Sequence, residues 1–464
     1  MLSFQGEDEN FALVRFEKML KTNDTYFFDS TDFERIISHY LNDGKITLAE
    51  KAVDLALNQH PAALALQLFK VEILILKEQT KEALQLLNTV SAIEKTNEDV
   101  YILKASIYSK EGNHQKAITT LKKALLFTDD LFEINNLLAM EQLFLDNYDK
   151  ALQHFQICLT HNPEDANTLY NIVYCYEMQE REKELIPYLN NFIDKNPYNE
   201  LAWHLLGKQY FEQKKYKKAL RAFDYATLID EQFIGALIEK AKTYEKLKNF
   251  KQAAACYHIT LKLDDATAFV YLRLGICYQE LKRNDLATFY YNEAIKEDPN
   301  LIKAWVAIIT FYMERDALAK ALHYTKKAIN ANETSPILWK IAAVINAESQ
   351  QYEESELAYD QCLDLGNYEK NTYLNYVDVL LTLGKKEKAI SILLQAKEYY
   401  EDALILYLLA AFCYDLDKAE ANLYLLAALE ADKTIYKEIA SQFNSLESKK
   451  AKRVYKAFMA GEEL

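Results

Sequence analysis

Small and apolar residues recur along this chain with a period of 34 positions. Stepping by 34 from Ala219 reaches eleven positions without an insertion or deletion, and nine of them hold alanine. Because a fixed period of this length is the signature of stacked structural units, the chain is predicted to be a repeat protein. The positions are Ala49, Ala83, Ala117, Ala151, Leu185, Ala219, Ala253, Ala287, Ala321, Ser355 and Ala389.

Other columns keep the same register when this alanine is numbered position 20. Position 4 is mostly bulky, position 8 is small or aliphatic, and position 11 is tyrosine in eight of twelve repeats. Positions 4, 7, 8 and 11 share one face of an α-helix, and positions 20, 24 and 27 share one face of another. Each repeat is therefore predicted to be two helices, A and B, which approach closely through the small residues at positions 8 and 20.

Glycine and proline mark the predicted ends of these helices. Gly44, Gly112 and Gly384 fall at position 15, where helix A must stop, and glycine there suits a left-handed C-cap. Proline stands at position 32 in four repeats and would end helix B. In the last repeat the alanine of position 20 comes two residues early, as Ala421, which predicts a shorter turn between A and B.

The columns resemble the tetratricopeptide repeat, whose pattern is W-x2-L-G-x2-Y, then A-x3-F-x2-A, then P. The resemblance covers about residues 30 to 433 and implies an all-α fold, a right-handed superhelical α-solenoid of about twelve 34-residue repeats with helical caps. In overall style the chain is similar to long bacterial proteins made of these repeats alone. The sixth repeat matches nearly perfectly, with Trp203, Leu206, Gly207, Tyr210, Ala219, Phe223 and Ala226 in place.

Three parts are expected along the chain. Residues 1–29 would form an N-terminal cap helix whose Phe11, Val14 and Leu20 face the first repeat, residues 30–433 the solenoid, and residues 434–464 the C-terminal capping helices. The repeats are expected to start near residues 30, 64, 98, 132, 166, 200, 234, 268, 302, 336, 370 and 404.

Charge and hydropathy limit the class of function. The net charge of -15 is spread along the chain and argues against a general nucleic-acid surface. No apolar run approaches the roughly 18 residues of a membrane span, and the first residues are acidic where a signal peptide is basic, so we expect a cytoplasmic protein without membrane insertion. The basic run Lys449–Lys456 is expected to be the solvated face of the last helix, with a nucleic-acid or membrane contact as the alternative.

Motifs that carry chemistry are missing from the sequence. It has no GxGxxG, P-loop, GxSxG or HExxH motif. The cysteines follow the repeat rather than a CxxC spacing, so they are expected to be small core residues, with metal binding as the alternative. We therefore predict a non-enzymatic protein with no catalytic residue, cofactor or metal site. The cysteines are Cys158, Cys175, Cys256, Cys277, Cys362 and Cys413.

Function is then expected to come from a surface. In proteins that this chain resembles, the A helices line a concave groove that takes peptides or partner helices, mainly through positions 2, 5, 9 and 12. Aromatic residues interleaved with lysine at these positions favour partner binding, while packing between adjacent A helices is the alternative. The predicted partner-binding residues are Asn167, Tyr170, Tyr174, His204, Lys208, Phe211, Lys242, Phe269, Leu272, Ile276 and Lys303.

One specialised groove can be tested on the sequence. Chaperone-binding proteins of this family grip a C-terminal carboxylate with a clamp of lysine, asparagine and arginine. Lys340 and Asn375 come nearest to it, but Val344 replaces the first asparagine, and Ile405 and Leu409 replace the final basic pair. No clamp of the Hsp70 or Hsp90 type is therefore predicted.

The sequence thus predicts a scaffold or adaptor that binds another protein or peptide in its groove. One alternative is a regulatory or accessory subunit that binds nucleic acid or a small ligand, and another is an enzyme. The partner, the pathway, the oligomeric state and the choice between the groove and the convex face stay open.

Overall fold

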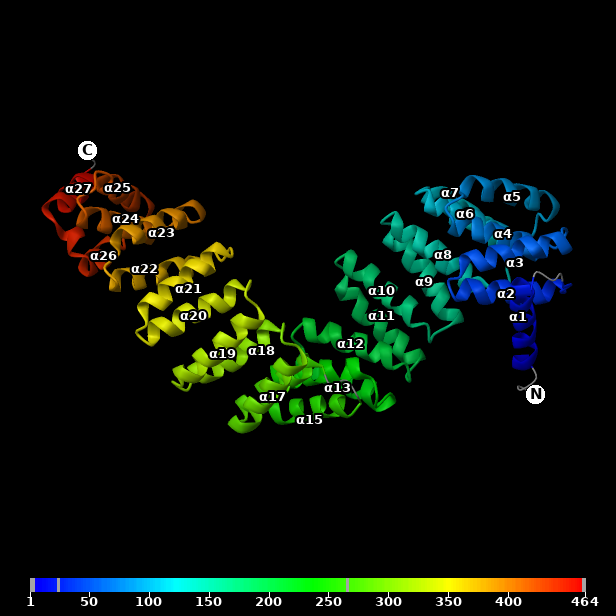
Figure 1. Cartoon of the computed structure of the whole chain (residues 1–464), viewed down its shortest axis with the longest axis horizontal. Helices are drawn as coiled ribbons and strands as arrows, with labels where there is room; N and C mark the ends of the chain where they lie inside the picture. Colours follow the sequence, from blue (N-terminus) through cyan, green and yellow to red (C-terminus); the bar gives the residue numbers. More distant parts are fainter. Residues whose placement is uncertain (1–4, 23–25, 264–266, 461–464) are drawn as a thin grey trace. The chain divides into compact units, whose positions relative to one another are not determined.

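The computed structural model describes residues 5–22, 26–263 and 267–460 of the 464-residue chain. Within those residues it contains 27 α-helices, one 3₁₀-helix and no strand. Within each of the two units described below, the helices pair side by side and stack in chain order (Figure 1). The predicted all-α solenoid of helical repeats is confirmed.

The chain divides into two compact units, Met1–Asp230 and Glu231–Leu464. The first contains α1 (Gln5–Thr22), α2 (Ser30–Asn42), α3 (Ile46–Gln59), α4 (Leu64–Leu76), α5 (Thr80–Ile93), α6 (Glu98–Lys110), α7 (His114–Ala124), α8 (Leu131–Phe144), α9 (Tyr148–His161), α10 (Ala166–Met178), α11 (Glu182–Lys195), α12 (Glu200–Glu212) and α13 (Tyr216–Ile229).

The second contains α14 (Ile234–Lys246), α15 (Phe250–Lys262), α16 (Ala268–Glu280), α17 (Asn284–Glu297), α18 (Ile302–Met313), α19 (Leu318–Ala331), α20 (Pro336–Glu348), α21 (Tyr352–Asp364), α22 (Lys370–Thr382), α23 (Lys386–Tyr399), α24 (Ala403–Asp415), α25 (Ala421–Asp432), α26 (Tyr436–Gln442), η1 (Asn444–Glu447) and α27 (Lys449–Ala460). The even-numbered helices α2 to α24 are the A helices and the odd-numbered helices α3 to α25 are the B helices. The predicted boundaries at residues 29 and 433 stay predictions.

The residue at position 8 of helix A controls how closely helix B approaches. The seven pairs with glycine or alanine there are all packed more closely than the five with valine or isoleucine. The residue at position 24 of helix B is large where the residue at position 8 is small. Aromatic residues occur at position 24 only in repeats with glycine or alanine at position 8. The two positions therefore share one volume, which is filled from one helix or the other. These aromatic residues are Phe155, Phe223, Tyr257, Tyr291 and Tyr359.

Two glycines show this shared volume directly. A Cβ atom on Gly207 would lie 2.5 Å from Cε1 of Phe223, and one on Gly275 would lie 2.4 Å from Cδ1 of Tyr291. Both rings are fully buried. The aromatic ring of helix B therefore lies where the side chain of helix A would otherwise be.

The fifth repeat, α10 and α11, departs from the small-residue pattern. Val173 stands at position 8, Leu185 replaces the alanine of position 20, and Phe192 takes position 27, which is alanine in most repeats. All three side chains are buried. Because bulky residues fill a contact surface that elsewhere holds small ones, α10 and α11 are the most loosely packed A and B helices.

Every A helix ends in a left-handed residue. Across the described chain, the twelve turns from A to B each contain one residue with φ between 49° and 73°, at position 15 in all repeats but the last. Gly44, Gly112 and Gly384 are three of these, so the predicted glycine caps are confirmed. In the sixth repeat the amide of Lys214 donates to the carbonyl of Phe211 and that of Lys215 to Tyr210, which is the Schellman pattern.

The last repeat keeps the shifted register but not the predicted shorter turn. Ala421, Leu425 and Ala428 of α25 are buried at the spacing of positions 20, 24 and 27. However, residues 416–420 separate its two helices, against residues 213–215 in the sixth repeat. The prediction of a shorter turn is wrong because α25 begins at the position-20 alanine and lacks the first turn of other B helices.

The cap helix α1 packs on the first repeat through a stripe of three residues. Ala12, Phe16 and Met19 are buried. The ring of Phe16 lies 5.9 Å from that of Phe28 and 6.2 Å from that of Phe33, centroid to centroid. This aromatic cluster joins the cap to the repeat.

The predicted face of the cap helix is wrong at two of three residues. Phe11 is 68% exposed and Val14 is 58% exposed, while Leu20 is partly buried against the first-repeat core. Two apolar stripes lie side by side on this helix, and the one that contains Phe16 meets the repeat.

At the other end of the chain, α27 presents its basic run to solvent. Ala451, Val454 and Ala457 are buried, while Lys449 and the other basic residues of the run are exposed. The prediction of a solvated basic face is confirmed.

The shared volume of positions 8 and 24 leads to a double-mutant prediction. Gly207→Val should lower the free energy of unfolding by about 1–3 kcal/mol, because the new side chain overlaps the ring of Phe223. Adding Phe223→Leu should restore part of this loss, since the second, fifth and eleventh repeats pair valine with leucine at these positions. Denaturant unfolding of the wild type, both single variants and the double variant measures the coupling. Strictly additive losses would show that the two positions do not share their space.

Candidate functional site

The predicted partner-binding residues lie on the A helices of the fifth to ninth repeats. In the first unit, Asn167, Tyr170 and Tyr174 are on α10, and His204, Lys208 and Phe211 are on α12. In the second unit, Lys242 is on α14, Phe269, Leu272 and Ile276 are on α16, and Lys303 is on α18.

Helix α10 exposes a pair of tyrosines. Tyr170 and Tyr174 stand one turn apart and are each 46% exposed. The ring of Tyr174 meets that of Tyr148 edge-on at 6.4 Å between centroids. Asn167 is exposed on the first turn of the same helix. All three side chains are therefore accessible to a partner.

On α12 only part of the predicted surface is exposed. Lys208 is exposed, and Phe211 is half-buried with its ring 5.4 Å from that of Tyr216. His204 is only 8% exposed, and its ring meets that of Phe223 edge-on at 5.9 Å. The expectation that His204 points outward is wrong, because the ring of Phe223 offers it an apolar surface to pack against.

Burial also changes the protonation of His204. It lowers the pKa of the imidazole to about 4, and the positive charge of Lys208 acts in the same direction. The side chain is therefore neutral near pH 7.

In the second unit, Lys242 and Phe269 come together from α14 and α16. The Lys242 Nζ lies 5.4 Å from the ring centroid of Phe269 and 2.8 Å from Oε1 of Glu239. Phe269 is 39% exposed. A cation, an acid and an aromatic ring thus share one accessible surface, and Lys303 on α18 is also exposed.

Leu272 and Ile276 belong more to packing than to the surface. Leu272 is 6% exposed and lies in the core cluster that contains Trp305, and Ile276 is partly buried against the same cluster. For Leu272 the structure favours the alternative of packing between A helices, because its neighbours on α16 and α18 cover it.

A cavity on the A helices of the first unit was missed by sequence reasoning. Its volume is about 430 Å³. Its residues come from α2, α4, α6 and α8, and we call it the acidic groove. It is lined by Glu34, Ala65, Leu68, Phe69, Glu72, Asp99, Ile102, Leu103 and Glu133.

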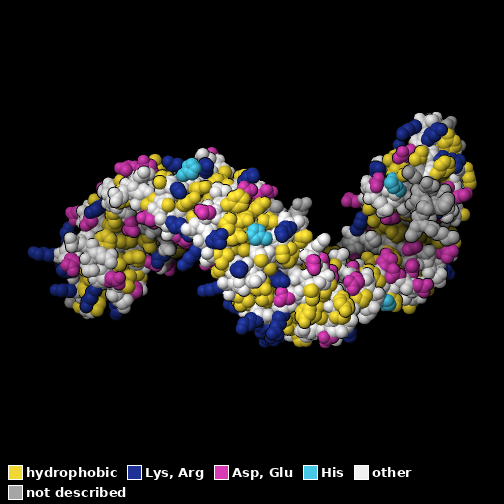
Figure 2. Space-filling view, turned by 90° about the horizontal axis from the view of Figure 1, so that it is seen from below, with side chains coloured by type: hydrophobic (Ala, Val, Ile, Leu, Met, Phe, Trp, Pro, Cys, Tyr) yellow, Lys and Arg dark blue, Asp and Glu magenta, His cyan; other side chains and the backbone are white. Residues whose placement is uncertain are grey.

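Among the described residues, no cation pairs with a carboxylate of the acidic groove. Within the described chain, Glu34, Glu72, Asp99 and Glu133 accept no side-chain hydrogen bond and form no ion pair. Partial burial raises the pKa of Glu72, Asp99 and Glu133, and nearby carboxylates raise the last two further. In Figure 2, acidic side chains gather beside hydrophobic ones near the right-hand, N-terminal end of the visible face.

A signal for this groove exists in the sequence. In the first four repeats, positions 2, 5, 9 and 12 hold four carboxylic acids and no lysine or arginine. The family pattern is strongest in the middle repeats, so the partner-binding residues were predicted in those repeats.

A smaller cavity of about 230 Å³ lies in the second unit, where the A helices α20 and α22 and the B helix α21 line it. Val344 and Val379 contribute apolar surface to it, and burial raises the pKa of Asp378 at its edge. Asn375 also lines it, whereas the Nζ of Lys340 lies 2.6 Å from a carboxylate oxygen of Glu369.

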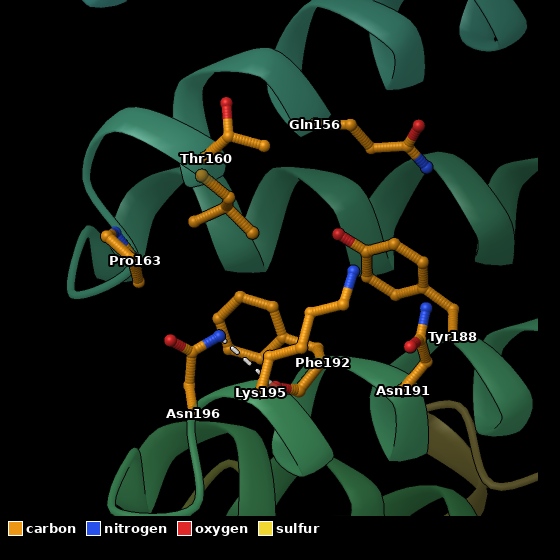
Figure 3. A pocket seen from close by; sticks show the side chains of 9 residues that line it. Gln156, Thr160, Pro163, Tyr188, Asn191, Phe192, Lys195 and Asn196 are labelled. Atoms are coloured by element: carbon orange, nitrogen blue, oxygen red, sulfur yellow. Dashed lines mark hydrogen bonds between the residues drawn. The ribbon is translucent and has the colours of Figure 1, made fainter.

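A cavity of about 510 Å³ lies between the B helices α9 and α11 (Figure 3). Gln156 and Thr160 line it from α9, and Tyr188, Asn191 and Lys195 from α11. It lies beside the fifth repeat, whose bulky residues loosen the packing of α11. We therefore interpret it as a consequence of that packing.

Groups that could carry chemistry are mostly in the core. All six cysteines are buried and none forms a disulfide, and burial raises the pKa of the Cys175 thiol to about 12. Among the described residues, no three His, Cys, Asp or Glu side chains are placed to hold a metal ion. In the part of the chain that the structure describes, no helix is both long enough and apolar enough to cross a membrane.

Comparison with known families gives a direct result. Two models of the tetratricopeptide repeat match the chain, one at residues 74–141 and the other at residues 270–301 and 371–403. Together with the 34-residue columns and the stacked helix pairs, these matches decide the family. The chain contains tetratricopeptide repeats. Its repeats support a protein–protein interaction scaffold as the general class of function, and this family is typically non-enzymatic.

Two curated proteins are similar to part of this tetratricopeptide repeat protein. The human Protein O-mannosyl-transferase TMTC1 is 28% identical over 141 residues, which cover 29% of this chain and 16% of that protein. Anaphase-promoting complex subunit 3 of Schizosaccharomyces pombe is 25% identical over 138 residues, which cover 30% of this chain and 21% of that protein. The similarity thus spans about a fifth or less of the length of these relatives.

Solved structures of repeat proteins are similar as well. One is the APC/C hetero-tetramer Cut9-Hcn1, which is 15% identical with a TM-score of 0.35. The match covers 88% of this chain and 94% of the matched chain of that structure. Another is YrrB, a TPR protein with an unusual peptide-binding site, which is 17% identical with a TM-score of 0.31. The match covers 38% of this chain and 92% of the YrrB chain.

The buried imidazole of this tetratricopeptide repeat protein predicts a pH effect on stability. The pKa of His204 is about 4 in the folded chain, against an ordinary value of 6.5. Between pH 4 and pH 6.5, this imidazole therefore binds a proton in the unfolded chain but not in the folded chain. Its contribution to stability is therefore lost as the pH falls through this window, by up to about 3 kcal/mol. His204→Leu should remove that contribution, so its thermal midpoint should fall less than that of the wild type between pH 7 and pH 4.5.

The exposed His161 provides the control for this measurement. His161→Leu should follow the wild type at both pH values. If His204→Leu also follows the wild type, the imidazole is not buried as described.

Proposed function

We propose that this protein is a non-enzymatic scaffold or adaptor that binds a partner protein or peptide along the surface formed by its A helices. The observation that carries the proposal is that, in each unit, A helices of neighbouring repeats line a cavity with apolar walls. Concave apolar surfaces with a few polar groups are the usual form of binding sites.

Exposed aromatic side chains support the same surface. Tyr170 and Tyr174 present large, rigid contact areas on α10, and Lys208 stands at position 9 of the next A helix. Tyrosine is among the residues that dominate the binding energy of protein interfaces. Many such contacts along the repeats would supply the affinity.

The proposal gives no role to catalysis or to nucleic acid. The thiol of Cys175 and the imidazole of His204 are buried and so are not presented at the surface. Burial also raises the pKa of this thiol and lowers the pKa of this imidazole. The carboxylates of the acidic groove would repel a phosphate backbone. A cytoplasmic location is part of the same proposal and stays a prediction.

A comparison of two surface variants tests the proposed surface. Tyr170→Ser with Tyr174→Ser should reduce capture of the partner by the full chain about tenfold or more, because interface tyrosines often contribute 1–2 kcal/mol each. Proteins captured from an extract of the native cell are quantified by mass spectrometry, and circular dichroism checks that helicity is unchanged.

The control removes two exposed apolar residues outside the A helices, by Tyr198→Ser with Leu228→Ser. It should retain the proteins that the tyrosine variant loses. Loss with the control and retention with the tyrosine variant would place binding on the other face and overturn the proposal.

A further inference from the structure

We propose that the acidic groove of the first unit binds a basic amphipathic segment of a partner protein. Apolar side chains of the segment would lie on the groove floor, and its lysine or arginine side chains would meet the four carboxylates. This inference rests on the proposed scaffold function and names the chemistry of one partner.

The floor of the groove is apolar and accessible. Ala65, Leu68 and Phe69 come from α4, and Ile102 and Leu103 from α6, and all five are only partly buried. The volume of about 430 Å³ falls in the range of typical ligand pockets. Covering this floor with apolar side chains would remove it from water, which is favourable.

The carboxylates extend along the groove from one helix to the next. Glu34 is on α2, Glu72 on α4, Asp99 on α6 and Glu133 on α8. Each of four successive A helices therefore contributes one acid. This arrangement suits an extended or helical segment with several cations better than one compact ion, and no three of the acids come together as a metal site in the described chain.

Nearby lysines do not neutralise these acids. The Nζ of Lys70 lies 2.8 Å from a carboxylate oxygen of Asp54, on the B helix α3. Partial burial lowers the pKa of Lys104, and the positive charge of Lys123 on α7 lowers it further. Both lysines stand at position 7, which belongs to the packing face of helix A.

A contrast within the same protein shows what a structural acid looks like. Glu356 is 7% exposed, and its carboxylate accepts hydrogen bonds from Lys385 and Lys388. Burial alone would raise its pKa, but the hydrogen bonds and the positive charges of the two lysines together outweigh burial and lower it. Glu72 is partly buried without such a partner, and its pKa is raised. A bound ammonium or guanidinium group would give Glu72 the charge-assisted hydrogen bond that it lacks.

A designed peptide tests the groove. The probe is a fluorescein-labelled amphipathic peptide, LKKLLKLLKKLLKL, and fluorescence anisotropy with the full chain at 0.15 M salt measures its affinity. The groove variant combines Glu34→Gln, Glu72→Gln, Asp99→Asn and Glu133→Gln, and it should weaken binding at least tenfold relative to the wild type. Leu68→Ser with Phe69→Ser should also weaken binding, because the apolar floor is lost.

The matched control removes the same number of charges from exposed positions of the same unit. It combines Glu82→Gln, Glu111→Gln, Glu164→Gln and Glu182→Gln, and its affinity should stay within about threefold of the wild type, since exposed charges are screened. Equal losses in the groove and control variants would reduce the effect to general charge attraction and overturn the inference.

Folding and self-association are checked in parallel. Glu72→Gln should not lower the thermal midpoint near pH 7, because a carboxyl with a raised pKa destabilises the folded state when it is ionised. Self-association of the wild type in sedimentation experiments, lost in the groove variant, would identify a second copy as the occupant and overturn the inference. If the groove variant binds the peptide normally while the tyrosine variant loses its partners, this inference fails and the scaffold function stands.

Discussion

The side chains at positions 8 and 24 of each repeat fill one common space, and the rest of the structure depends on how they divide it. Where helix A has glycine at position 8, as at Gly207 and Gly275, an aromatic ring of helix B lies against the backbone of helix A. Where valine or isoleucine remains, the helices stand further apart. The effect reaches the surface, because the ring of Phe223 draws His204 inward.

Packing constrains one face of each A helix and leaves the other free to vary. Positions 4, 7, 8 and 11 face the core in most repeats, whereas positions 2, 5 and 9 differ more in residue type along the chain. In the first four repeats these positions carry acids such as Glu72, and in the middle repeats they carry tyrosine and lysine. One scaffold thus presents different chemistry at different places along its length.

The sequence was sufficient for the helix pairs and the turns because both depend on local spacing. It failed where a side chain lies near the border of two helical faces. His204, Phe11 and Val14 are such residues: His204 is buried against a neighbouring ring, whereas Phe11 and Val14 are exposed. The acidic groove could not be recognised as a cavity, because its depth depends on the spacing of four helices. Its unpaired acids, however, are visible in the columns.

The left-handed residue that ends each A helix has a consequence for the mechanics of the chain. Nine of the twelve turns place a side chain such as Lys214 or Asp316 in this conformation, which costs roughly 1 kcal/mol relative to glycine. The cost is local, and stacked repeats open by short segments rather than all at once. The identity of one turn residue can therefore set how readily its own repeat frays, without altering the core or the binding surface.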